Sequence, residues 1–311
     1  MKIHSKNENT NVPHANPTYP PVPLTVPAAL TGLKYSVRHV EYPVRTRVVP
    51  DAYLYPVRTR KEDPSALTSN LLSSLFSKQS SDYHIHHAGW YTLTDLFHGT
   101  RARISVWGIP EFESTQVYPS LYAGSTDLRL FAGWTTSNDN KGCYSTECEG
   151  FVLSNVSGAP VPGRKVEPLS TYNGEDHFLT LSIKKDKETK DWSLYRDDNS
   201  NQILIGWWPK SLFNNSFDHA TKLVWAGGVF YPKNETSPPM GSGHAAYEGK
   251  NKAAYISHIK IYDQFDQTTI PDTNRVREFT DRSDCFTTDG FKYSHNDGYY
   301  LYYGGPPGCQ N

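Results

Sequence analysis

Short strand-like segments, separated by clusters of turn-forming residues, fill the chain from residue 83 onward. They recur about every 8–15 residues, a spacing typical of antiparallel sandwiches and barrels. The clearest segments are residues 102–107, 177–183, 192–195, 203–207 and 254–262. No helical periodicity long enough for a βαβ unit lies between them, which argues against a parallel sheet. The pattern therefore predicts an all-β fold, built as a two-sheet antiparallel sandwich.

Composition supports strands and argues against two classes of partner. The chain has 21 Tyr, 13 Phe and 7 Trp, interleaved with residues that favour strands and turns. Its 311 residues are enough for one large β domain and a smaller appendage. A formal net charge of -1 provides no basic field for nucleic acid or for an anionic membrane surface. No run of roughly 18 apolar residues is present that could span a bilayer.

The first 80 residues differ from the rest of the chain. Residues 17–33 are rich in proline, which suits an extended arm. The hexapeptide Tyr-Pro-Val-Arg-Thr-Arg occurs at 42–47 and again at 55–60. It predicts two edge strands, either a hairpin with solvated arginines or a basic surface that binds anions. Residues 63–78 have leucines at helical spacing and form the single predicted helix. We therefore divide the chain into an arm at 1–80 and a β domain at 81–311.

Cysteines and glycosylation sequons point to the secretory route. The four cysteines allow three pairings, of which proximity favours two bonds, Cys143–Cys148 and Cys285–Cys309. Sequons begin at three asparagines in polar, turn-like stretches: Asn155, Asn214 and Asn234. An even cysteine count together with sequons predicts a secreted protein or one in the secretory lumen. The first residues lack the apolar core of a signal peptide, so we interpret them as a processed start, with a cytosolic protein as the alternative.

A set of motifs in a fixed order resembles the neprosin family of plant and microbial glutamic peptidases. These motifs lie at 97–107, 116–122, 129–135, 142–148, 206–209, 240–244 and 302–306. The resemblance implies two packed antiparallel sheets curved around a cleft. It also implies a secretion signal and an N-terminal activation segment, although residues 1–80 look unlike the family in sequence.

The resemblance also implies where a pair of catalytic glutamates would stand. The first lies just upstream of the strand that begins at Gln116, where Glu113 aligns if one residue is deleted and Glu111 competes with it. Either glutamate is otherwise a solvated turn carboxylate. The second position falls at Gly228 or Val229, and neither side chain can carry a proton. Because hydrolysis needs a general base and an oxyanion partner, we expect little or no cleavage after proline at acid pH.

Other groups with chemical potential are weaker candidates. Glu248 follows the Met-Gly-Ser-Gly-His loop and is either a loop-ordering hydrogen-bond acceptor or a relocated acid. His84 and His86 would share one face of a strand and His87 the other, and no partner set completes a zinc site. We therefore expect neither a metal nor another cofactor. Ser242 does not fit the nucleophile-elbow motif, and paired cysteines leave no thiol nucleophile.

Aromatic and amide side chains remain in the expected cleft. They are Trp107, Gln116, Tyr118, Trp134, Trp225, His244 and Tyr255. They form either part of the core or a pocket for a flat, apolar ligand, with Glu113 and Gln116 as candidate catalytic groups. Our hypothesis is a repurposed neprosin-like protein that binds an apolar, partly aromatic small molecule and acts as a cyclase or pericyclase of natural-product biosynthesis. The alternatives are a secreted proline-cleaving glutamic endopeptidase with a relocated acid, and a non-catalytic carbohydrate- or peptide-binding module.

Overall fold

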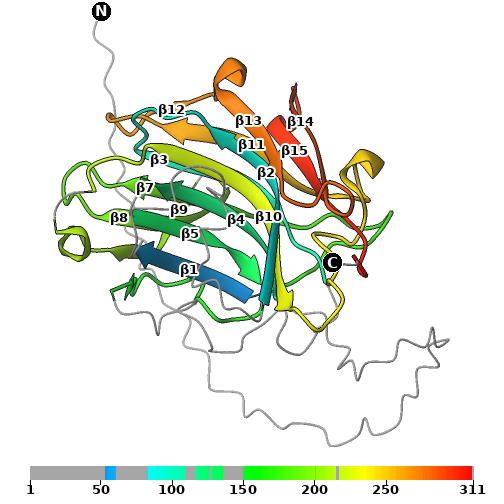
Figure 1. Ribbon diagram of the computed structural model, residues 1–311. Helices are drawn as coiled ribbons and strands as arrows, with labels where there is room; N and C mark the ends of the chain where they lie inside the picture. The colour runs from blue at the N-terminus through cyan, green and yellow to red at the C-terminus, as the bar shows by residue number, and fades with distance from the viewer. Residues whose placement is uncertain are drawn as a thin grey trace, which may run out of the picture. The chain divides into compact units, whose positions relative to one another are not determined.

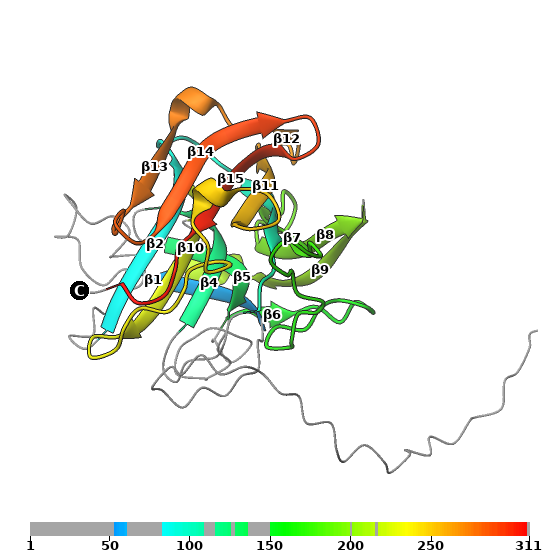
Figure 2. The same cartoon turned by 90° about the vertical axis from the view of Figure 1, so that its right-hand side faces the viewer.

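Two antiparallel sheets packed face to face form the fold (Figures 1 and 2). The computed structural model describes residues 53–60, 83–108, 116–125, 128–135, 150–199, 201–214 and 217–309. One sheet has the order β1 (Tyr53–Arg60), β5 (Leu128–Thr135), β4 (Gln116–Gly124), β10 (Lys222–Pro232), β2 (Tyr83–Thr92) and β13 (Val276–Thr280). The all-β sandwich predicted from the sequence is confirmed.

The second sheet contains nine strands. Its order is β14 (Thr287–Ser294), β15 (Gly298–Gly304), β11 (Ala254–Tyr262), β3 (Gly99–Ser105), β7 (Phe178–Lys185), β8 (Trp192–Asn199), β9 (Asn201–Trp208) and β6 (Val152–Leu153), and β12 (Thr268–Thr269) pairs with β11. The helical elements of the described residues are three short 3₁₀ turns: η2 (Lys210–Phe213), η3 (Ala246–Glu248) and η4 (Thr273–Arg275). Each of the five clearest predicted strand segments overlaps a strand of this sheet, in β3, β7, β8, β9 and β11, although the predicted 102–107 runs two residues past β3 and 177–183 begins one residue before β7.

The second copy of the hexapeptide forms the edge of the six-stranded sheet. It lies in β1, which pairs with β5 and has no neighbour on its other side among the described strands. An edge position tolerates Pro56, because proline has no N–H to give to a further strand. These residues precede the domain boundary predicted at residue 81, and the boundary itself stays a prediction. The first copy at 42–47, the proline-rich arm and the helix at 63–78 lie outside the described residues.

The main core lies between the two sheets. Strand alternation turns apolar side chains inward from both sides, for example Leu179, Leu181 and Ile183 from β7. On β10, Gly227 receives the ring of Tyr303 from the opposite sheet, and a Cβ at residue 227 would collide with that ring. A second, smaller cluster covers the other face of the six-stranded sheet: Tyr118, Tyr122, Phe131, Val224 and Ala226. That sheet is therefore apolar on both faces. Within the described residues, no helix is long and apolar enough to cross a membrane.

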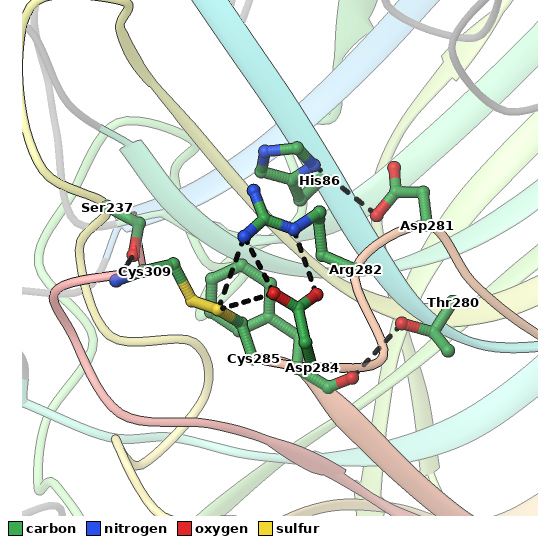
Figure 3. The surroundings of a disulfide bond; sticks show 9 residues. His86, Ser237, Thr280, Asp281, Arg282, Asp284, Cys285 and Cys309 are labelled. Atoms are coloured by element: carbon green, nitrogen blue, oxygen red, sulfur yellow. Dashed lines mark hydrogen bonds and ion pairs between the residues drawn. A yellow bond between two sulfur atoms is a disulfide. The ribbon is translucent and has the colours of Figure 1, made fainter. Parts of the chain in front are cut away.

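The predicted bond between Cys285 and Cys309 is present (Figure 3). Arg282 lies beside it, pairing with Asp284 at 2.8 Å and placing a guanidinium nitrogen 3.6 Å from the Cys285 sulfur. The backbone N–H of Cys309 donates to Ser237 Oγ at 2.9 Å. The bond joins the loop before β14 to the segment after β15, so it closes a loop around both strands. Cys143 and Cys148 lie outside the described residues.

Loss of this bond is expected to destabilise the fold by about 3 kcal/mol, because a loop of this length then gains freedom in the unfolded chain. The double variant Cys285→Ser/Cys309→Ser should show this as a lower urea midpoint. Wild-type protein unfolded in the presence of reductant provides the control, since its midpoint should fall at least as far. An unchanged midpoint in both samples would show that the bond contributes nothing to stability.

Candidate functional site

A row of side chains crosses the six-stranded sheet on the face turned away from the main core. Strand register places Gly228 of β10 directly opposite Tyr118 of β4 on one side and His87 of β2 on the other. Directly opposed residues on neighbouring strands share a face. Asp281 follows the end of β13, where Thr280 opposes Ala88. The sequence thus brings a phenol, an imidazole and a carboxylate, up to 194 residues apart, into one line.

The glycine lets the phenol reach the imidazole. The ring of Tyr118 lies over Gly228, and a Cβ at residue 228 would be 2.6 Å from the ring carbon Cζ. Real Cβ atoms do not approach so closely, so the ring occupies the space that a side chain at residue 228 would take. From there Tyr118 Oη lies 3.1 Å from His87 Nε2, in a buried hydrogen bond.

The imidazole of His87 is buried and neutral at pH 7. It is 2% exposed, and burial lowers its pKa to about 4, although Asp281 acts in the opposite direction. Asp281 Oδ1 accepts the backbone N–H of His87 at 2.9 Å, and its Oδ2 lies 4.0 Å from His87 Nδ1. Asp281 also lies 3.5 Å from Nδ1 of His86, as Figure 3 shows beside the disulfide. A carboxylate near Nδ1 favours the proton on that nitrogen, which leaves Nε2 to accept the Tyr118 hydroxyl.

Aromatic side chains surround this row. Tyr122 and Phe131 are buried with ring centroids 5.1 Å apart. Tyr91 and Phe279 form a second pair at 5.9 Å, and Phe230 packs at the side of the cluster. Polar groups in such apolar surroundings interact more strongly than in water. The arrangement can move a proton between phenol and imidazole while it excludes solvent.

The lowered pKa of His87 predicts a loss of stability in acid. Between pH 6.5 and about 4 the unfolded chain takes up a proton on His87 that the folded protein does not. Stability contributed by neutral His87 is therefore complete above pH 6.5 and falls as the pH drops to 4, by about 3 kcal/mol in total. Urea unfolding at several pH values should show a flatter profile for His87→Gln than for wild type. The exposed His295→Gln variant should keep the wild-type slope, and equal slopes in all three proteins would contradict the assignment.

The structure separates the aromatic residues that the sequence placed in one cleft. Tyr118 belongs to the row described above. Trp225 is fully buried in the core between the sheets, where its Nε1 donates to Thr100 Oγ1 at 2.9 Å. Trp107 follows the end of β3 and Tyr255 lies in β11; the indole Nε1 of Trp107 and the backbone N–H of Tyr255 both donate to Ser105 Oγ, at 3.1 and 2.8 Å.

The remaining candidates lie elsewhere or are placed only by their backbone. His244 Nδ1 is 3.1 Å from Glu248 Oε1, and Glu248 also accepts the hydroxyl of Tyr172 at 3.0 Å, so this glutamate joins two loops. Gln116 opposes Phe230 in β4, and Trp134 opposes Leu54 in β5. Glu111 and Glu113 lie outside the described residues. The three sequon asparagines are exposed, as a glycan requires, and their modification stays a prediction.

Two partners in the row were missed by sequence reasoning. The sequence points to His87 only as a potential metal ligand, and nothing in it singles out Asp281. The structure does place His84 and His86 on one face, with rings 5.8 Å apart, and His87 on the other. No group of three or more potential metal ligands occurs within the ranges that the structure describes. The local sequence of β10 carries no signal for the row, because only the structure shows that Val229 points into the core and that Gly228 therefore faces outward.

Comparison with known families agrees with the resemblance seen in the sequence. The family model for neprosin matches residues 113–306. The match covers more than half of the chain and includes β4, β10 and the strands after them. This chain therefore belongs to the neprosin family.

Proposed function

We propose that this protein does not hydrolyse peptides but binds a neutral, apolar and partly aromatic small molecule, which it cyclises without a cofactor. The observation that carries the proposal is the ring of Tyr118 over Gly228, hydrogen-bonded to His87. In the family resemblance a catalytic glutamate stands at residue 228 or 229. Here Val229 lies in the core and the space at Gly228 is filled by a phenol.

The uncharged Tyr118–His87 pair, which lies among aromatic side chains, suits a neutral ligand better than a peptide. Desolvation penalises a charged substrate, whereas flat apolar rings find matching surface on the half-buried Tyr91, Phe230 and Phe279. Orientation alone can lower the barrier of an intramolecular reaction by about 7–11 kcal/mol at best. A cyclisation needs little more than this, because it makes and breaks bonds within one molecule.

The row adds acid–base chemistry to orientation. Tyr118 donates to His87 Nε2, so the phenol oxygen can accept a proton from a substrate O–H or acidic C–H while its own proton passes to the imidazole. Asp281, whose Oδ2 lies 4.0 Å from His87 Nδ1, stabilises by its charge the imidazolium that forms. After ring closure the proton returns along the same path to another atom of the product. The product is then an isomer of the substrate, with no atoms gained or lost.

Metabolite analysis tests this proposal. Extracts of the source organism with and without the gene would be compared, and the compound that accumulates without it would be incubated with purified protein. We expect conversion to a compound of identical mass. Tyr118→Phe and His87→Gln should slow the conversion by about 10²–10⁴-fold, as the loss of a general acid–base group does. Tyr247→Phe, which removes the same hydroxyl from an exposed tyrosine, should react like wild type.

A peptidase assay decides between this proposal and hydrolysis. Proline-containing fluorogenic peptides would be incubated with the protein from pH 3 to 7, and we expect no cleavage. Acid cleavage that is lost in Asp281→Asn or in Glu113→Gln would identify a relocated acid and overturn the proposal. Failure of every accumulated compound to isomerise would overturn it as well.

A further inference from the structure

The outer face of the nine-stranded sheet carries an arginine, Arg103, that has no hydrogen-bond partner among the described residues. Arg101 and Arg103 lie two residues apart on β3 and therefore point to the same face. Arg101 is satisfied by Asp197, with Nε 2.7 Å from Oδ2 and Nη2 3.0 Å from the backbone oxygen. Arg103, by contrast, forms no hydrogen bond or ion pair with any residue that the structure describes, and its Nε is buried. Its guanidinium lies 3.8 Å from the ring centroid of Phe178.

A second polar atom beside Arg103 also lacks a partner. Thr180 of β7 opposes Arg103 in the strand register, and its Oγ1 is buried without a hydrogen-bond partner among the described residues. Buried polar atoms are almost always paired in folded proteins, by the protein, by water or by a ligand. Two such atoms on directly opposed residues, one of them on a group with five N–H donors, indicate that water or a ligand supplies the missing hydrogen-bond partners.

Half-exposed tyrosines continue this face across the neighbouring strands. Tyr255 of β11 opposes Tyr302 of β15, with ring centroids 6.5 Å apart, and Tyr300 follows at 5.6 Å from Tyr302. Tyr255 donates its hydroxyl to Asp176 at 3.0 Å. Burial raises the pKa of Tyr302 to about 12, so its phenol stays protonated and able to donate at neutral pH. We call the set of Arg103, Phe178, Tyr255, Tyr300 and Tyr302 the tyrosine–arginine face.

We propose that the tyrosine–arginine face binds an acidic oligosaccharide, with a uronate carboxylate on Arg103 and sugar rings on the tyrosines. The planar guanidinium matches a carboxylate through two parallel hydrogen bonds. The C–H faces of pyranose rings pack on aromatic rings, and their hydroxyls find acceptors and donors in Asp176 and the phenols. The face lies on the other sheet from the Tyr118–His87 row, so this site is independent of the proposed cyclisation.

Titration calorimetry with trigalacturonate tests the proposal. We expect binding, with an affinity at least about tenfold higher than for the neutral trisaccharide cellotriose, since one charge-assisted contact is lost. Acetate at the same ionic strength should not compete, which separates a sugar acid from a bare anion. Arg103→Met keeps an apolar stem over Phe178 and should lower the affinity at least about tenfold. Arg277→Met removes the same charge from an exposed arginine on β13 and should bind like wild type.

A second variant keeps the test decisive if Arg103→Met folds poorly. Tyr302→Ala removes a half-exposed ring and should weaken trigalacturonate binding while the melting temperature confirms the fold. No heat of binding with trigalacturonate would overturn the proposal. Equal affinity for cellotriose, wild-type affinity in both Arg103→Met and Tyr302→Ala, or equal weakening by Arg277→Met would also overturn it.

Discussion

Glutamate in place of Gly228 is expected to lower the free energy of unfolding by about 2–6 kcal/mol. Its Cβ would collide with the ring of Tyr118, and overpacking of this kind costs about 1–3 kcal/mol. The carboxylate would then be buried against a neutral His87 with no cation to pair it, which adds about 1–3 kcal/mol or more. Urea unfolding followed by circular dichroism would measure the change, and the same substitution tests whether the family's glutamate can be restored here.

Two further variants separate the collision from the buried charge. Gly228→Ala should show the overpacking cost alone, and Gly228→Glu/Tyr118→Ala should recover part of the loss because the ring is gone. Gly290→Ala is the matched control, since its added Cβ meets only the flexible end of Lys292 at 3.3 Å. A Gly228→Glu protein as stable as wild type would show that the Tyr118 ring does not rest on this glycine.

Alanine in place of Trp225 should cost about 3–5 kcal/mol, the usual range for removing a large aromatic side chain from a core. The indole is fully buried between the sheets, and its loss leaves a cavity and removes the hydrogen bond to Thr100. Thermal and urea unfolding would measure the effect, and near-ultraviolet circular dichroism would report the looser packing.

Trp225→Phe is the control, because it keeps most of the apolar volume and should lose far less stability than alanine. The comparison decides between a structural role and the role in ligand binding that the sequence suggested for Trp225. If Trp225→Ala kept wild-type stability but lost binding or turnover, the residue would line a site after all.

The sequence alone allowed the class of fold and the approximate positions of several strands to be predicted. The segment 254–262 alternates apolar and polar residues, because only one of its faces lies on the core, and its predicted bounds match β11. Pro56 and the charged alternation around it predict an edge strand, and β1 lies at the edge of the sheet among the described strands. Cys285 and Cys309 were paired correctly from their proximity in the chain.

The site could not be predicted in the same way, because β10 shows no alternation. Both faces of the six-stranded sheet are apolar, so residues 223–231 read as one continuous hydrophobic run. Composition therefore could not show that Trp225 faces the core while Gly228 faces away from it. His87 and Asp281 are brought together only by the pairing of β13 with β2, which local sequence does not encode.

The two adjacent glycines of β10 have a consequence for how this fold changes its chemistry. At residues 227 and 228 the strand has no side chain of its own. A tyrosine ring from another strand covers each glycine, Tyr303 over Gly227 on one face and Tyr118 over Gly228 on the other. The functional groups present at these two positions of the sheet are therefore determined by residues outside β10. A single substitution at residue 118 changes what stands over Gly228, while the backbone that supports it stays the same. Substitutions on the neighbouring strand can therefore place a different chemical group over Gly228 without any change in β10.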